Sequence, residues 1–189
     1  MIQTKEDLYY YLREDAKQCG KPLKRNFKQR IVDWLFPDNN FNFQVCLRKL
    51  EYYSNIGGVL RYYYMIKLSR LRVKTQIELN PNVAGPGLHI SHGKIVVSSM
   101  AKIGSHCKLL SDVTLGGQGR YDKLGAPILG NNVFVGTGAK IIGNIVIADG
   151  VVIGANAVVT KSIMEPYTTW AGNPARKVSE VGSTHYLTR

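Results

Sequence analysis

The sequence predicts a mainly β protein: a parallel β-helix of six-residue repeats with an α-helical segment in front of it. Three observations predict this fold. A large aliphatic residue recurs every six positions, a second apolar residue follows it by four, and the residue types of the second series repeat after eighteen. A short internal period of this kind indicates a unit that stacks on copies of itself. Eighteen residues then form one coil of three sides, so we expect a triangular prism filled with aliphatic side chains.

The N-terminal part differs in composition from the rest. Residues 1–76 hold 15 of the 25 Lys and Arg residues and eight of the 11 tyrosines. Residues 4–19 begin with a capping pattern, Thr4 followed by Asp7, and predict a helix. Helical spacing also marks three further stretches, 28–36, 44–53 and 57–74. We therefore divide the chain into three parts: a basic helical segment (1–75), a β-helix (76–178) and a C-terminal tail (179–189).

The two apolar series define the register of the prism. The large aliphatic residues of the first series are Val97, Ile103, Leu109, Leu115, Leu129, Val135, Ile141, Ile147, Ile153 and Val159. The second series is Ala101, Cys107, Val113, Val133, Ala139, Ile145, Val151, Ala157 and Ile163. Between the sides, pairs such as Asn131-Asn132 and Asp149-Gly150 supply residues that tolerate a positive φ at the corners. Cys107 is therefore expected in the core and His106 at a solvated corner.

One interruption breaks the repeat. Leu115 and Leu129 lie fourteen positions apart where twelve would keep the register. The residues between them, 116–127, are rich in glycine and charge. We expect a loop that leaves the prism, and loops that protrude from rigid scaffolds tend to carry function.

Four stretches carry a resemblance to a known family: IELNPNVAGPGLHISHGKIVV, SDVTLGGQG, GAPILGNNVFVGTGAKIIGNIVI and WAGNPARKV. Over residues 77–178 the chain resembles the hexapeptide-repeat acyltransferases, specifically the serine acetyltransferase branch and its relatives that modify polysaccharides. The resemblance implies a left-handed coil, although parallel crossovers are usually right-handed. It also implies a homotrimer with acetyl-CoA, the co-substrate, in the groove between neighbouring prisms.

The implied chemistry moves an acetyl group from a thioester to a hydroxyl, which requires a base for the hydroxyl proton. A neutral imidazole suits this step near pH 7 and contributes roughly 10²–10⁴-fold. His92 matches the family's catalytic histidine. Glu78 stands where the family keeps the carboxylate that orients the imidazole, although the spacing of fourteen residues is one shorter than the family pattern. We therefore expect His92 and Glu78 to be catalytic.

Small residues let a pantetheine arm lie close to the backbone, and the resemblance places four of them beside the cofactor: Gly116, Gly136, Ala139 and Ala157. Arg176 and Lys177, in the AGNPARKV stretch, are expected to meet the phosphates at the nucleotide end. The alternative for these two residues is a solvated basic tail. His89 and Ser91 are expected to line the substrate site.

The expected acceptor is a hydroxyl of a sugar in a surface polysaccharide or its lipid-linked precursor. In serine acetyltransferases an aspartate precedes the catalytic histidine and a second histidine stands in an Arg-His-Pro stretch. Here Ser91 and Ala126 occupy those places. Because a site built on such polar contacts discriminates strongly, their loss disfavours a zwitterionic amino acid. Serine O-acetylation in cysteine biosynthesis and a non-catalytic β-helix scaffold are the alternatives.

Composition and motifs limit the remaining choices. The net charge is +12, but no nucleic-acid-binding motif accompanies it, so no nucleic-acid partner is expected. The spacing of His89, His92 and His106 does not match a zinc site, and no metal is expected. Three scattered cysteines, a charged N-terminus and the lack of a long apolar run predict a cytoplasmic protein without a signal peptide or a membrane span. Residues 57–74 are expected either to pack on the prism or to contact the inner face of an anionic membrane.

Overall fold

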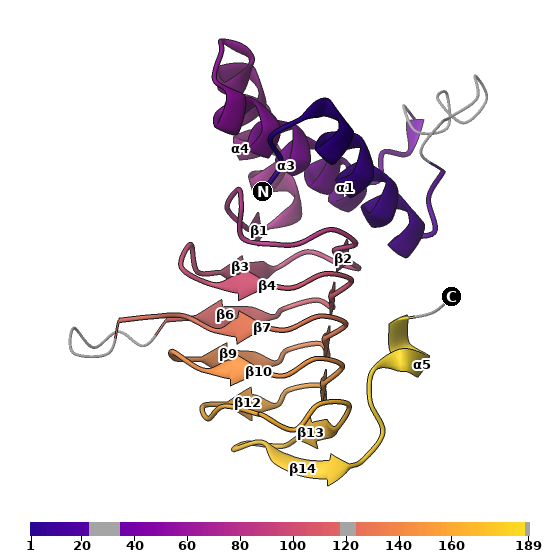
Figure 1. Cartoon of the computed structure of the whole chain (residues 1–189), viewed down its shortest axis with the longest axis vertical. Coiled ribbons are helices and arrows are strands. Elements are labelled where there is room, and N and C mark those ends of the chain that lie inside the picture. Colours follow the sequence, from indigo (N-terminus) through magenta and orange to yellow (C-terminus); the bar gives the residue numbers. More distant parts are fainter. Residues whose placement is uncertain (23–34, 118–123, 188–189) are drawn as a thin grey trace.

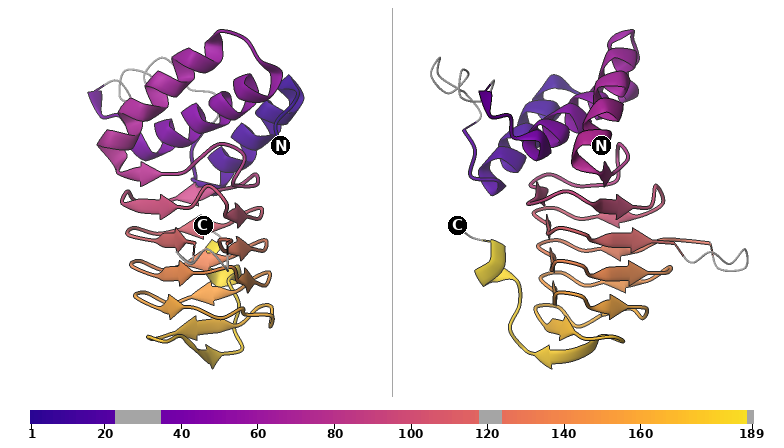
Figure 2. Two further views of the ribbon diagram at one scale, coloured as in Figure 1. Left: turned by 90° about the vertical axis from the view of Figure 1, so that its left-hand side faces the viewer. Right: turned by 180° about the vertical axis from the view of Figure 1, so that it is seen from behind.

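The computed structural model describes residues 1–22, 35–117 and 124–187. The N-terminal helices form one end of the molecule, a column of short strands extends from them, and a short C-terminal helix lies beside the column (Figures 1 and 2). The described helices are α1 (Lys5–Gln18), α3 (Asn39–Ile56), α4 (Leu60–Thr75) and the short α5 (Thr184–Leu187). The architecture is a left-handed parallel β-helix with N-terminal helices, as the sequence predicted.

The N-terminal helices lie where their sequence signals place them. In the capping box of α1, Asp7 N–H donates to Thr4 Oγ1 at 3.0 Å and Thr4 N–H donates to Asp7 Oδ2 at 2.9 Å. The stretch 44–53 lies in α3, and most of 57–74 lies in α4. The helix expected over 28–36 lies almost entirely outside the described residues. Because α4 ends at Thr75 and β1 begins at Ile77, the change from helix to strand falls where the composition shifts.

The strands form three sheets, one for each side of the prism. Sheet A has the order β1-β3-β6-β9-β12, sheet B the order β4-β7-β10, and sheet C the order β2-β5-β8-β11-β13-β14. All pairings are parallel except that between β13 and β14. The bounds are β1 (Ile77–Glu78), β2 (His89–Ile90), β3 (Ile95–Val97), β4 (Lys102–Ile103), β5 (Lys108–Leu109), β6 (Thr114–Gly116), β7 (Ile128–Leu129), β8 (Phe134–Val135), β9 (Lys140–Ile142), β10 (Val146–Ile147), β11 (Val152–Ile153), β12 (Val158–Val159), β13 (Thr169–Ala171) and β14 (Arg176–Ser179).

Strand pairing confirms the coil of 18 residues. Val158 lies opposite Lys140, and Val152 lies opposite Phe134. Across the loop that follows β6, Thr114 also lies opposite Lys140, at a separation of 26 residues. The fourteen-residue step from Leu115 to Leu129 replaces one six-residue side, and not two sides of twelve residues as the sequence suggested. The loop therefore adds eight residues to its coil instead of two.

Both apolar series point into the prism, where no member is more than 8% exposed. Cys107 is fully buried, and burial raises the pKa of its thiol to about 12, so it is a core residue as predicted. The same hydrophobic core continues into the helices through Phe43, Leu47 and Leu68. The helical segment thus closes one end of the prism and is not packed apart from it.

The C-terminal tail and one corner of the prism make long-range contacts that the sequence did not predict. The tail returns along sheet C, where the Tyr186 ring lies 4.8 Å from that of Phe134 and Leu187 O accepts a hydrogen bond from Gln18 of α1 at 3.4 Å. His106 does occupy a corner, with φ of 56°, but it is not simply solvated. Its Nε2 lies 3.4 Å from Glu14 Oε2, so this corner is connected to α1.

Candidate active site

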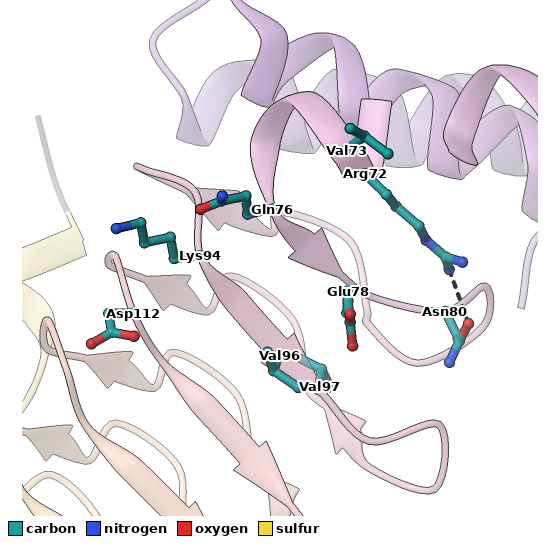
Figure 3. A pocket seen from close by; sticks show the side chains of 9 residues that line it. All are labelled: Arg72, Val73, Gln76, Glu78, Asn80, Lys94, Val96, Val97 and Asp112. Atoms are coloured by element: carbon teal, nitrogen blue, oxygen red, sulfur yellow. Dashed lines mark hydrogen bonds between the residues drawn. The ribbon is translucent and has the colours of Figure 1, made fainter. Parts of the chain in front are cut away.

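A cleft of about 580 Å³ opens on the outer face of sheet A, where the end of α4 meets the first coils (Figure 3). Its lining residues are Arg72, Val73, Gln76, Glu78, Asn80, Lys94, Val96, Val97 and Asp112. Two basic and two acidic side chains share this space with amide groups and valines. The cleft therefore offers charges of both signs beside an apolar floor.

Strand alternation directs Glu78 into the cleft. In β1, Ile77 is buried in the prism and the next residue, Glu78, is exposed on the outer face opposite Val96. Figure 3 shows its carboxylate on the same side of the sheet as the guanidinium of Arg72. Among the described residues, Glu78 forms no ion pair and no hydrogen bond through its side chain, so its exposed carboxylate is open to a ligand.

His92 lies exposed at the corner between β2 and β3, and the packing of Gly93 fixes this corner. A Cβ at Gly93 would lie 1.9 Å from the carbonyl oxygen of Thr75, so a larger residue does not fit. Lys94 N–H donates to the same carbonyl at 3.1 Å, and Asp112 N–H donates to Gly93 O at 3.4 Å. The corner is thus held between the end of α4 and the next coil of the prism, and Lys94, two residues after His92, lines the cleft.

One chain does not bring His92 and Glu78 into contact. Glu78 lies opposite Val96, which is four residues beyond His92 along the chain. No hydrogen bond connects the imidazole and the carboxylate in the part of the chain that the structure describes. Catalytic hydrogen bonds often form only when the substrate is bound. The orienting role of Glu78 therefore stays a prediction.

His89 and Ser91 lie on the other side of the same corner, on or next to sheet C. Ser91 Oγ is 3.3 Å from His89 Nε2, and Ser91 O accepts a hydrogen bond from Asn40 Nδ2 at 3.3 Å. Neither residue lines the cleft on sheet A.

Two of the expected cofactor contacts are wrong. Ala139 and Ala157 are 0% exposed inside the prism, so no cofactor on the surface of the chain can reach them. Their small size serves the stacking of the second apolar series. Gly136 is also buried, and a Cβ there would lie 2.7 Å from Ala155 N. Gly116, at the end of β6, is partly exposed and remains a predicted contact.

A second cavity, of about 350 Å³, lies at the far end of the prism and includes Arg176, Lys161 and Trp170 in its lining. Arg176 is exposed there, as a phosphate contact requires. Lys177 instead forms ion pairs with Glu165 and, at 2.7 Å, with Glu180. The hydrogen bonds to these glutamates raise the pKa of Lys177. Its charge is thus already balanced, and Arg176 is the better candidate for an anionic ligand.

The sequence reasoning missed Arg72, Lys94 and Asp112 in the cleft. A signal for two of them was present, because Gln76, Lys94 and Asp112 are spaced by 18 residues and therefore stack at one corner. Arg72 gave no such signal, since it belongs to α4. Its Nη2 donates at 3.0 Å to both Leu79 O and the Asn80 side chain, while its buried Nε has no partner among the described residues. Within the same described ranges, no group of three or more His, Cys, Asp or Glu is placed to hold a metal ion.

The prism of six-residue repeats is the fold of a class of transferases. The family described as bacterial transferase hexapeptide (six repeats) matches residues 126–161 of the chain. Fold and sequence thus place the protein among the hexapeptide-repeat transferases.

Known relatives narrow this class. A serine acetyltransferase of Helicobacter pylori is 40% identical over 124 residues, which cover 64% of this chain and 72% of the relative. That of Synechococcus elongatus is 39% identical over 113 residues, covering 59% of this chain but only 46% of the relative, so the match spans about half of its length. The crystal structure of the Brucella abortus serine acetyltransferase in complex with coenzyme A superposes with a TM-score of 0.74 at 28% identity, covering 95% of this chain and 71% of that one. The chain belongs to the serine acetyltransferase family.

Proposed function

We propose that the protein is an acetyl-CoA-dependent O-acetyltransferase in which His92 is the general base. The observation that carries the proposal is the cleft on sheet A, where Glu78 and Lys94 lie beside the corner that holds His92. The family and the relative crystallised with coenzyme A support acetyl-CoA as the donor.

In the proposed reaction, the acceptor oxygen attacks the thioester carbonyl while its proton passes to the His92 imidazole. Collapse of the tetrahedral intermediate breaks the carbon–sulfur bond, and the imidazolium returns the proton to the thiolate of coenzyme A. The products are an O-acetyl ester and the free thiol. A carboxylate near the imidazolium stabilises its charge, which is the role we assign to Glu78.

We propose serine as the first candidate acceptor, which is the alternative to the sugar expected from the sequence. The names of the relatives favour it. The cleft also suits a zwitterion, because Arg72 and Lys94 could meet a carboxylate and Asp112 an ammonium group. Lys140 already contacts Asp112, with Nζ 3.4 Å from Oδ1. The ammonium would therefore share this carboxylate.

A sugar hydroxyl remains the second candidate, on one specific observation. Ala126, which replaces the family's second histidine, is 3% exposed and offers no polar contact to an amino acid. The relatives described above are serine acetyltransferases and give no support to a role in polysaccharide synthesis. The case for a sugar acceptor therefore rests on the residues of this chain alone.

An acceptor panel decides between them. Thiol release from acetyl-CoA is measured with L-serine, with ethanolamine and 3-hydroxypropionate (each lacking one charge), and with free and nucleotide-linked sugars. We expect kcat/KM for serine to exceed that of either singly charged analogue by at least about tenfold, the effect of one charge-assisted contact. A preferred sugar would reverse the assignment of the acceptor. If none of the acceptors in the panel led to thiol release, the non-catalytic scaffold would be favoured.

Arg176→Ala is expected to raise KM for acetyl-CoA by about tenfold with kcat little changed, because an exposed guanidinium contact to a phosphate contributes uniform binding. Lys177→Ala is the matched control, since its ammonium is occupied by Glu165 and Glu180. Steady-state kinetics at varied acetyl-CoA measure both. Equal effects of the two substitutions would contradict the distinction.

We propose that the active assembly is a homotrimer, as the family implies. On the outer face of sheet B, Ile128 and Val146 are 43% and 38% exposed, which favours a neighbouring subunit there.

All three cysteines are free thiols, which suits a protein that works in the reducing cytoplasm.

A further inference from the structure

Helix α4 carries apolar residues on two sides. The inner side packs on α3 and the prism through Leu68, Leu71 and Thr75, which are buried. The outer side holds a second apolar set with helical spacing, which we call the outer stripe: Tyr62, Met65 and Ile66, exposed by 51%, 50% and 54%. Because a surface helix normally keeps one side polar, two apolar sides indicate that the outer one also meets a partner.

The outer stripe continues into the connection between α3 and α4. There Ile56, Val59 and Leu60 are 49%, 81% and 46% exposed. Figures 1 and 2 show this connection at the end of the molecule farthest from the last coils of the prism. The apolar residues therefore form a protruding end and not a groove.

The charge of α4 limits what the partner can be. The helix contains no Asp or Glu, and four of its cations are exposed: Arg61, Lys67, Arg70 and Lys74. With 100° per residue, Lys67, Arg70 and Lys74 border one side of the outer stripe and Arg61 the other. None of the four forms an ion pair within the described ranges. Two copies of this surface would place cations against cations, so the complementary partner is apolar and anionic.

We propose that the outer stripe and the α3–α4 connection dock α4 on the surface of an anionic lipid bilayer. The helix would lie in the plane of the membrane, with its apolar side chains at the acyl boundary and its cations among the phosphates. No described helix is long and apolar enough to cross a bilayer, so the contact is peripheral. A fluid surface accepts a protruding apolar end, whereas a protein partner would need a groove to match it.

Co-sedimentation of the full chain with vesicles tests this directly. We expect binding to vesicles of phosphatidylglycerol and phosphatidylcholine, weakened by salt, and little binding to phosphatidylcholine alone. Each cation near an anionic surface contributes about fivefold, so Lys67→Gln/Arg70→Gln should lower partitioning by about 25-fold. Lys5→Gln/Lys17→Gln makes the same change of charge on exposed residues of α1 and should have little effect.

A second pair of variants tests the apolar part. Tyr62→Ser/Ile66→Ser should lower vesicle binding by at least about tenfold, since burial of a large apolar side chain is worth that much or more. Tyr9→Ser is the matched control, because Tyr9 is 54% exposed on α1. Circular dichroism and thiol release check that each variant is folded. Absent vesicle binding, or binding that the α4 variants do not weaken, would overturn the proposal, as would self-association that Tyr62→Ser/Ile66→Ser abolishes without any vesicle binding.

Discussion

Replacing His92 by alanine is expected to lower kcat for thiol release from acetyl-CoA by roughly 10²–10⁴-fold, the usual contribution of a general base. His92 is exposed at its corner, and its side chain makes no hydrogen bond to the described residues. The substitution should therefore leave the fold unaffected. KM for acetyl-CoA should change by less than about threefold, because the imidazole acts on the acceptor proton in the transition state. Steady-state kinetics at saturating acceptor measure both constants.

His106→Ala is the matched control for this experiment. His106 also occupies a corner of the prism, with φ of 56° and a side chain 37% exposed, but it lies beside α1. Its loss should leave kcat within about twofold. If His92→Ala retained full turnover, or if both substitutions lowered kcat alike, His92 would not be the base and the cleft on sheet A would lose its proposed chemistry.

Periodicity predicted the fold well because the prism repeats a single local rule. Each side needs an aliphatic residue such as Ile141 pointing inward, and each corner needs a residue such as Asn132 that tolerates a positive φ, here 56°. These requirements are local and therefore legible in the sequence. The cofactor assignment, which came from the family resemblance, overlooked the place of Ala139 and Ala157 in the second apolar series, where both residues are small because the coils stack there and have no exposed surface.

The site was less predictable because its residues come from parts of the chain with different periods. Lys94 and Asp112 follow the 18-residue period and could have been found by it. Arg72 reaches the cleft from a helix whose position on the prism no local pattern specifies. The C-terminal return along sheet C, fixed in part by Tyr186 on Phe134, is likewise a long-range contact without a sequence signal.

Arg48 has a structural role that the composition did not indicate, because the sequence analysis counted it only as one positive charge of the basic segment. It is 0% exposed on α3. Its Nε lies 2.8 Å from Asp15 Oδ2 of α1, and its Nη1 lies 3.0 Å from Glu51 Oε2. Burial acts to lower the pKa of Arg48, but the two carboxylates outweigh burial and raise it. The guanidinium also donates to Ala84 O at 2.8 Å and to Gly85 O at 2.6 Å, so one side chain connects two helices to the first coil.

Arg48→Met is therefore expected to lower the free energy of unfolding by about 3–5 kcal/mol, because it leaves two buried carboxylates without their cation. Urea denaturation followed by circular dichroism measures the change. Arg13→Met removes an exposed partner of Glu14, with the Arg13 side chain 57% exposed, and should cost less than about 1 kcal/mol. The triple variant Arg48→Met/Asp15→Asn/Glu51→Gln should recover part of the loss, since the penalty comes from the unpaired charges and not from the missing arginine itself. If Arg48→Met were no more destabilising than Arg13→Met, the helices would not depend on this cluster for their attachment to the prism.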